Sequence, residues 1–163
     1  MPVIEPGQQA PAFSLPDQHG TIHTLASYAG RPLVIYFYPK DDTSGCTKEA
    51  CTFQETLPRF EASKAAVLGI SVLGTDSKAK FAKKYGLSFP LLADEDHAVA
   101  DRYGAWQQKS MYGRKYMGVA RITYLIGPDG RVVRRWDSVK PAEHPAEVLA
   151  AIEALSSGTT ARR

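Results

Sequence analysis

The sequence predicts a three-layer α/β sandwich in which a mixed β-sheet lies between layers of helices. The chain has 163 residues, a length that suits one domain with a sizeable core. Its apolar fraction of 44% and charged fraction of 23% are ordinary for a globular protein. Strand-like and helix-like segments alternate along it, and this order places parallel strands in one sheet with helices on its faces.

The first half of the chain predicts a hairpin, two buried strands and a helix. Residues 12–25 contain two short strands around a polar turn at residues 17–20. Residues 33–38 form a continuous apolar and aromatic run, which is typical of a central strand buried on both faces. The pattern from residue 46 to about residue 60 fits a helix, and residues 65–72 form a second buried strand.

The next part predicts a helix, a strand, a second helix and a loop. The first helix covers residues 77–86, with Ser77 as its N-cap and Gly86 just after its end. Residues 89–94 predict a short strand, and residues 95–104 predict a helix closed by a glycine. Residues 105–120 have no clean period, so we expect an irregular loop there.

The end of the chain predicts a hairpin and a final helix. Residues 121–136 contain a Gly-Pro-Asp-Gly turn between two strand-like runs, and residues 141–155 form an amphipathic helix. The complete order, with its N-terminal β-hairpin, is the thioredoxin-like arrangement with additions. We expect residues 1–163 to form a single domain, with a flexible tail from about residue 156.

Composition argues against several classes of partner. The net charge is only +3, and the basic clusters at residues 114–115 and 131–135 are interpreted as solvated surface rather than a nucleic-acid patch. No apolar run approaches the roughly 20 residues of a membrane helix. The N-terminus has neither the basic nor the apolar region of a signal peptide. We therefore expect a cytoplasmic protein without nucleic-acid or membrane partners.

The chain has two cysteines, Cys46 and Cys51, in the segment YPKDDTSGCTKEAC. Their spacing matches neither a repeated metal-binding pair nor the Cys-x-x-Cys pair of a thiol–disulfide oxidoreductase. The sequence offers no His/Cys cluster that could hold a metal, because the histidines are scattered; they are His19, His23, His97 and His144.

Cys46 has the position of a nucleophile. It follows the predicted strand at residues 33–38, and the carboxyl ends of parallel strands are where α/β sheets carry their sites. With Thr43 as N-cap, Cys46 is the third residue of the helix, where the helix dipole and unpaired backbone N–H groups favour a thiolate. Gly45 leaves space beside the sulfur. Position alone also fits a small buried residue.

Cys51 lies five residues further along the same predicted helix. In an intact helix this spacing separates the Cα atoms by roughly 8–9 Å, whereas a disulfide needs less than about 7 Å. Two interpretations remain open. Cys51 is an ordinary buried helix residue, or the helix unwinds after oxidation of Cys46 to a sulfenic acid so that the second thiol can condense with it.

The segment YPKDDTSGCTKEAC resembles the active-site segment of the peroxiredoxins, and most closely their Q-type branch, also called bacterioferritin comigratory protein. Pro39, Thr43 and Cys46 match the family's Pro-x-x-x-Thr/Ser-x-x-Cys pattern, and Cys51 matches the second cysteine of the Q-type subset that resolves within one chain. Arg121 matches the arginine on a late strand. The likeness extends over nearly the whole chain, through APAFSLPDQHG, GISVLGTDS, YGLSFPLLAD and KSMYGRKYMGVARITYLIGPDG.

Arg121 also has a physical reason to be at the site. A cation that enters a buried strand needs a partner, and a thiolate can serve as one. From the sequence alone, an ordinary ion pair at the rim of the sheet explains Arg121 equally well. Ile122 stands where this branch often has serine, and we expect this difference to alter the floor of the active-site pocket.

The resemblance implies reduction of hydrogen peroxide or an organic hydroperoxide. The Cys46 thiolate attacks the peroxide, and Arg121 and nearby N–H groups stabilise the developing charge. The Thr43 hydroxyl accepts a hydrogen bond from the peroxide while it donates toward the sulfur. Pro39 shields the sulfur, Cys51 resolves the sulfenic acid, and thioredoxin reduces the resulting disulfide. The resemblance implies that no metal or organic cofactor is required, and that the assembly is a monomer or a dimer.

A second function class stays open from the sequence. The same disulfide can act as the switch of a redox-sensing or chaperone-like binding protein, which is oxidised once rather than turned over. Continuous consumption of peroxide distinguishes an enzyme from such a sensor.

Overall fold

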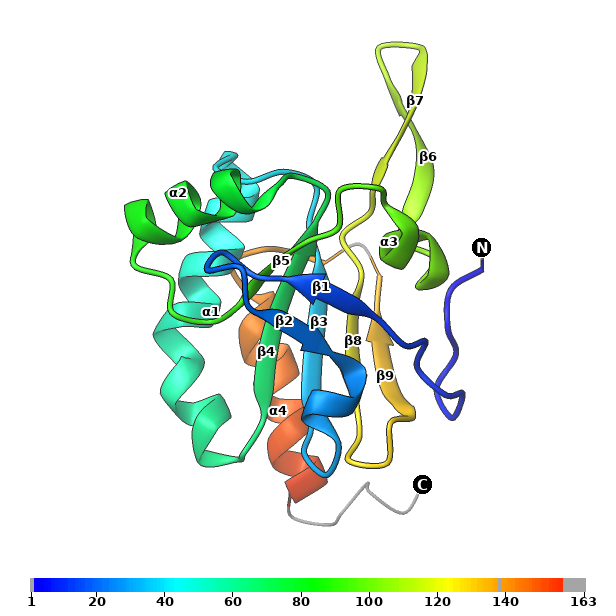
Figure 1. The fold of residues 1–163 in the computed structure, drawn as a ribbon. Coiled ribbons are helices and arrows are strands. Elements are labelled where there is room, and N and C mark those ends of the chain that lie inside the picture. The colour runs from blue at the N-terminus through cyan, green and yellow to red at the C-terminus, as the bar shows by residue number, and fades with distance from the viewer. Residues whose placement is uncertain (1, 138, 157–163) are drawn as a thin grey trace.

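The centre of the molecule is a five-stranded mixed β-sheet. The structure is a computed structural model that describes residues 2–137 and 139–156. The strands have the order β5-β4-β3-β8-β9 (Figure 1). β3 runs parallel to β4 and β4 to β5, whereas β8 is antiparallel to both β3 and β9. The strands are β3 (Leu33–Phe37), β4 (Ala66–Ser71), β5 (Leu91–Ala93), β8 (Thr123–Ile126) and β9 (Val132–Trp136).

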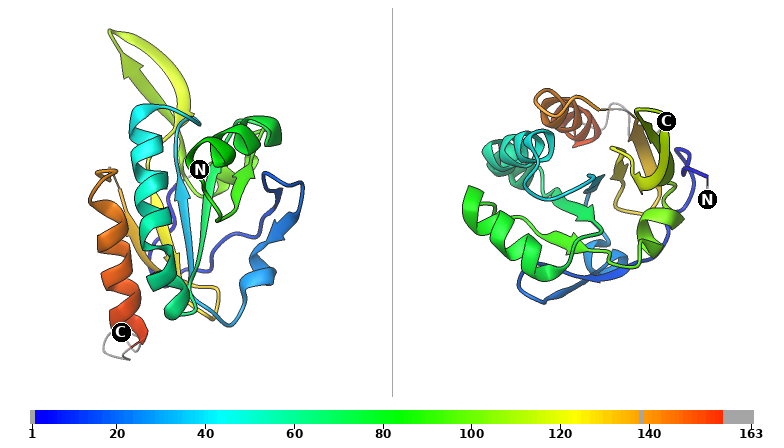
Figure 2. Two further views of the ribbon diagram at one scale, coloured as in Figure 1. Left: turned by 90° about the vertical axis from the view of Figure 1, so that its left-hand side faces the viewer. Right: turned by 90° about the horizontal axis from the view of Figure 1, so that it is seen from above.

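Helices and the N-terminal segments cover the two faces of this sheet, which gives the expected three layers. α1 and α4 stand side by side on one face, and α3 lies on the opposite side together with the N-terminal hairpin (Figure 2). The helices are α1 (Ser44–Ala62), α2 (Thr75–Tyr85), α3 (Ala98–Arg102) and α4 (His144–Ser156). The prediction of a thioredoxin-like sandwich is confirmed.

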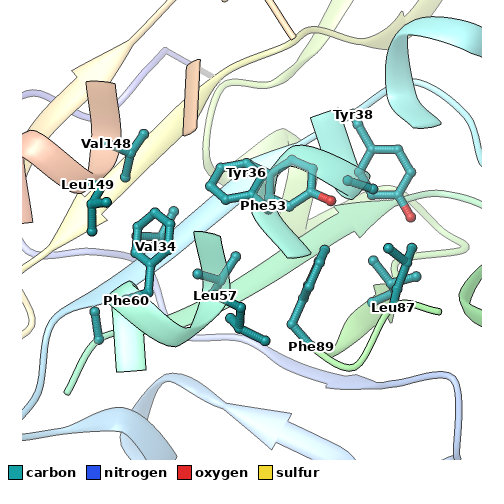
Figure 3. Packing of buried hydrophobic residues seen from close by; sticks show 14 of the residues in the cluster. Val34, Tyr36, Tyr38, Phe53, Leu57, Phe60, Leu87, Phe89, Val148 and Leu149 are labelled. Atoms are coloured by element: carbon teal, nitrogen blue, oxygen red, sulfur yellow. The ribbon is translucent and has the colours of Figure 1, made fainter. Parts of the chain in front are cut away.

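β3 is the strand around which both core layers form. All five of its residues are buried, and its alternate side chains enter different clusters. Val34 and Tyr36 join the cluster under α1 and α4, which Figure 3 shows, while Ile35 and Phe37 join the cluster on the other face. Each fully buried side chain of this size contributes about 1.5–3 kcal/mol relative to exposure. The strand therefore gives a rigid base to the loop that follows it.

The N-terminal hairpin has the predicted form. β1 (Ser14–Pro16) and β2 (Ile22–Thr24) pair antiparallel. The Asp17 carboxylate closes the turn by accepting hydrogen bonds from the backbone N–H groups of His19 and Thr21. A four-residue 3₁₀ helix, η1 (Leu25–Tyr28), follows directly. It was not predicted, because one turn is too short to show a hydrophobic period.

Residues 105–120 contradict the prediction of an irregular loop. They contain a second hairpin, β6 (Trp106–Met111) and β7 (Arg114–Val119), which projects away from the body (Figure 1). Tyr112 and Gly113 at its tip have φ angles of 52° and 79°, as a tight two-residue turn requires. Most of its side chains are exposed on both sides, so the apolar–polar alternation of a half-buried strand is missing.

Two predicted helix boundaries were also wrong. α2 begins at Thr75 with Gly74 as N-cap, and the hydroxyl of Ser77 instead donates to Asp41 at 2.7 Å. α3 is shorter than predicted and begins at Ala98, because His97 has a φ of 52° in the left-handed region and cannot belong to the helix. The buried Asp94 carboxylate accepts hydrogen bonds from backbone N–H groups of the first turn. Gly86 does close α2 in the left-handed conformation, with φ 66°.

Two expectations concern the ends and surfaces of the chain. The predicted flexible tail falls, apart from Ser156 at the end of α4, outside the described residues. Within the described ranges, no helix combines the length and apolar character needed to cross a membrane.

Candidate active site

The site lies where the carboxyl end of β3 leads into α1. Thr43 is the N-cap of α1, so Cys46 is the third residue of the helix, as predicted. The helix is already closed at this point, because the backbone N–H of Thr47 donates to the carbonyl of Thr43 at 2.8 Å. The Cys46 side chain is buried, with 1% of its surface exposed. Its sulfur therefore lies beside the unpaired N–H groups and positive dipole end of α1.

Arg121 forms a bridge between the sulfur and a buried carboxylate. Its Nη2 donates to Cys46 Sγ at 3.2 Å, and its Nη1 donates to Glu49 Oε1 at 3.1 Å. Arg121 precedes β8 rather than opening it, but its neighbour Ile122 accepts a hydrogen bond from the Phe37 backbone and so lies against β3. The guanidinium fork thus holds two groups of α1 from a segment 72 residues away from Glu49.

The close approach of Arg121 to the start of α1 requires a glycine at position 45. A Cβ atom at position 45 would lie 2.8 Å from Arg121 Nη2, closer than non-bonded atoms approach. The predicted space beside the sulfur therefore exists, and it is the guanidinium that occupies it.

Glu49 belongs to the site, although sequence reasoning missed it. It is fully buried, and burial raises its pKa to about 7, even though Arg121 lowers it. Its Oε2 has no hydrogen-bond partner among the described residues. A signal was present in the sequence: Glu49 follows Cys46 by three residues, a spacing that puts both side chains on one helix face.

Within the described residues, neither Thr43 nor Pro39 makes a hydrogen bond to the Cys46 sulfur. The expectation that Thr43 donates toward the sulfur is wrong: its exposed hydroxyl donates to the Lys40 carbonyl at 3.1 Å instead, and it makes no capping bond to α1. Pro39 is half-buried and immediately follows Tyr38 at the end of the strand run.

Cys51 is separated from Cys46 by the helix itself. Both thiols are free, and α1 is continuous between them. Burial raises the pKa of the Cys51 thiol, and the nearby Glu55 carboxylate raises it further. This raised pKa favours the protonated thiol of Cys51 in the state the structure describes, and the helix must open before the two sulfurs can meet.

A buried polar network holds the loop that precedes α1. Lys78 is fully buried, and its ammonium donates to Ser71 Oγ at 2.5 Å and to Tyr38 Oη and Asp41 Oδ1 at 3.3 Å each. Burial lowers the pKa of Lys78, and the Asp41 carboxylate opposes that shift. The sequence did not predict this network, because Lys78 has the pattern of an ordinary residue in the predicted helix. It ties the loop to β4 and α2 just ahead of Cys46.

The arrangement can carry out nucleophilic chemistry at sulfur. A cysteine at a helix N-terminus is paired with a guanidinium that can hold both the thiolate and a small oxygen-containing substrate. Across the described ranges, no group of three or more His, Cys, Asp and Glu side chains is placed to hold a metal ion.

Comparison with known proteins connects this geometry with one family. The AhpC/TSA family model matches residues 6–135. Peroxiredoxin Bcp of Bacillus subtilis is 40% identical over 153 residues, which cover 94% of this chain and 98% of the relative. A solved structure of Xanthomonas campestris peroxiredoxin Q has a TM-score of 0.84 and 42% identity, and the match covers 88% of this chain and 91% of that one.

A second solved structure covers more of the chain. The bacterioferritin comigratory protein of Xanthomonas campestris has a TM-score of 0.87 and 40% identity, and the match covers 96% of this chain and 99% of that one.

The raised pKa of Glu49 predicts a pH dependence of stability. Between pH 4.5 and about 7 the folded state keeps a proton that the unfolded chain has lost. The contribution of Glu49 to the free energy of unfolding is therefore complete below pH 4.5 and is lost as the pH rises toward 7. Glu49→Gln should remove this part of the pH dependence, as measured by urea unfolding at a series of pH values. Glu153→Gln, an exposed change, is the control; equal slopes in Glu49→Gln and wild type would contradict the assignment.

Proposed function

The chain belongs to the AhpC/TSA family and is a peroxiredoxin, a thiol-dependent peroxidase, and on this premise we propose that Cys46 is its peroxide-reducing cysteine and Cys51 its resolving cysteine. The observation that carries the proposal is the 3.2 Å contact between Arg121 Nη2 and Cys46 Sγ at the start of α1. It pairs the nucleophile with a cation that can also hold the substrate.

In the first step, the Cys46 thiolate attacks the distal oxygen of the hydroperoxide. An S–O bond forms, the O–O bond breaks, and the electron pair stays on the leaving oxygen, which takes a proton and departs as an alcohol or water. Cys46 is oxidised to a sulfenic acid. Arg121 and the N–H groups of the first turn of α1 lie where they can stabilise the charge on the leaving oxygen.

Thr43 and Pro39 supply the walls of the proposed peroxide site. The Thr43 hydroxyl donates to the Lys40 carbonyl, so its lone pairs are available to accept a hydrogen bond from the hydroperoxide. Pro39 is half-buried and has no backbone donor, and its proposed role is to cover the approach to the buried sulfur and limit the access of water.

In the second step, the Cys51 thiol condenses with the sulfenic acid to give a disulfide and water. The first turns of α1 must unwind for this, because the two cysteines are five positions apart in one continuous helix. A dithiol protein, proposed to be thioredoxin, then reduces the disulfide by exchange: one of its sulfurs attacks, its second sulfur resolves the mixed disulfide, and both cysteines of this chain return to thiols.

The substrate range is proposed to include organic hydroperoxides as well as hydrogen peroxide. An alkyl peroxide reduction activity is described for the bacterioferritin comigratory protein of Xanthomonas campestris, whose structure this chain resembles. We propose the cytoplasm as the compartment, because two free cysteines stay reduced there, and a monomer or dimer as the assembly.

The first test of this proposal is Cys46→Ser. A serine hydroxyl in this position stays protonated and is a far weaker nucleophile, so thioredoxin-coupled peroxide consumption should be abolished. Thr47→Ser is the matched control, because it alters the next residue of the same turn without removing the sulfur. Appreciable coupled turnover by Cys46→Ser would exclude Cys46 as the nucleophile, and oxidation of wild type without repeated turnover would indicate a sensor.

Arg121→Lys should reduce the second-order rate of Cys46 oxidation by well over tenfold. Lysine keeps the charge but cannot donate to the sulfur and to Glu49 through one planar fork. Stopped-flow measurement of Cys46 oxidation gives the rate directly, with Arg59→Lys, an exposed change, as control. A loss of less than about threefold, equivalent to roughly 0.7 kcal/mol, would show that the fork has no part in the reaction.

Disulfide formation should open the start of α1 while leaving the sheet intact. Amide hydrogen exchange over residues 43–53 is expected to accelerate in the oxidised protein, whereas the β3 amides stay protected, because opening a terminal turn costs little compared with global unfolding.

Cys51→Ser is the counterpart of this experiment. The variant should keep α1 protected after one equivalent of peroxide and should leave Cys46 prone to overoxidation. Equal protection of α1 in reduced and oxidised wild type would rule out an intramolecular role for Cys51.

A further inference from the structure

The β6–β7 hairpin gathers exposed apolar and cationic side chains on one projection. The large hydrophobic residues exposed in the described part of the chain are Ile22, Met111, Tyr112, Tyr116, Met117 and Val133, and four of these six lie in the hairpin. Tyr112 at the tip is 98% exposed. The hairpin also carries Lys109, Arg114 and Lys115 and no acidic residue. Apolar side chains held out in water on a cationic ribbon indicate a surface that is covered part of the time.

The base of the hairpin is joined directly to the catalytic cluster. β7 ends at Val119, and Arg121 follows two residues later. The backbone N–H of Ala120 donates to the carbonyl of Ala105 at 2.8 Å, which fixes the base where the ribbon leaves the body. The hairpin rises from the same end of the molecule as the start of α1 (Figures 1 and 2). A protein bound along it would therefore stand beside Cys46.

The register of the hairpin defines which side faces the cluster. Lys109 pairs with Tyr116 and Met111 pairs with Arg114, so these four side chains share one side of the ribbon, here called the site side. Lys109 is half-buried, and its ammonium interacts electrostatically with both Arg121 and Cys46. The opposite side of the ribbon carries Lys115 and Met117.

We propose that the site side of the hairpin, together with Tyr112, is the docking surface for the dithiol protein that reduces the Cys46–Cys51 disulfide. This inference rests on the proposed function, which requires a protein to bring a thiolate to these sulfurs in every cycle. The partner that fits is a dithiol protein with an apolar patch and acidic residues at the rim of its own dithiol.

Charge and chemistry favour this occupant over the others. The site side carries two cations, Lys109 and Arg114, and the hairpin contains no acidic residue, so this surface attracts an acidic partner and speeds its encounter with the site. A second copy of the chain, bound hairpin to hairpin, would place two sets of these cations against each other. The small contact area that one ribbon offers also suits a reductant, which must leave after each exchange.

The experiment compares Arg114→Glu, on the site side, with Lys115→Glu, the same charge change on the opposite side. Both side chains are exposed, so neither substitution should affect folding. Peroxide consumption is measured twice, with a bacterial thioredoxin, its reductase and NADPH as the electron source, and with dithiothreitol alone. Arg114→Glu should raise the KM for thioredoxin by about tenfold or more, whereas Lys115→Glu should change it by less than about threefold. Turnover with dithiothreitol, which needs no docking, should stay within about twofold of wild type for both.

An uncharged variant gives a second, independent measurement. Tyr116→Ala should raise the KM for thioredoxin without changing turnover with dithiothreitol, and Met117→Ala, on the opposite side, is its control. Higher ionic strength should raise the wild-type KM and should have less effect on Arg114→Glu.

Several outcomes would overturn the inference. An unchanged KM in Arg114→Glu and Tyr116→Ala, with normal wild-type turnover, removes the docking surface and leaves the proposed function intact. Equal effects of Arg114→Glu and Lys115→Glu reduce it to unspecific charge attraction. Wild-type turnover with dithiothreitol but not with thioredoxin refutes the proposed reductant and the inference with it. Binding to phosphatidylglycerol vesicles, or a dimer dissociated by Arg114→Glu, with the KM unchanged, assigns the surface to lipid or to a second copy instead.

Discussion

The hydrogen-bonded bridge from Cys46 through Arg121 to Glu49 is the interaction on which the rest of the site depends. It brings one cation between two groups that can each carry a negative charge in a buried place, where an uncompensated charge is costly. One guanidinium cannot neutralise both, so a protonated Glu49 leaves the positive charge to the sulfur. The pKa of about 7 for Glu49 reflects two opposing effects: burial favours the protonated carboxyl, and Arg121 favours the carboxylate.

The features that depend on local chemistry could be predicted from the sequence. β3 was predicted because both of its faces are apolar, and the start of α1 because Thr43 has the residue type and position of an N-cap. The place of Cys46 followed from these two elements. The link to Arg121 could be expected only from the family resemblance, since the two residues are 75 positions apart and no periodicity connects them.

The features that were missed depend on contacts between distant segments or on exposure. Lys78 looks like any surface lysine of an amphipathic helix until the fold brings it onto Asp41, 37 residues away. The β6–β7 hairpin was missed for the opposite reason: few of its side chains are buried, so burial imposes no pattern on its sequence. Glu49 was within reach, but a carboxylate on a helix is ordinarily solvated, and only the approach of Arg121 shows why this one is buried.

The part of α1 that is proposed to open lies between two rigid parts of the chain. Ahead of Cys46, the Lys78 network fixes the loop, whereas Thr43 makes no side-chain capping bond and Gly45 weakens the first turn. Beyond Cys51, Phe53 is fully buried and stacks on Tyr36 with ring centroids 4.6 Å apart (Figure 3). Unwinding past Phe53 would remove a large aromatic side chain from the core, at a cost of about 3–5 kcal/mol by analogy with truncation of buried aromatics. Cys51 lies two residues before Phe53, so the helix can open as far as the second cysteine without giving up this anchor.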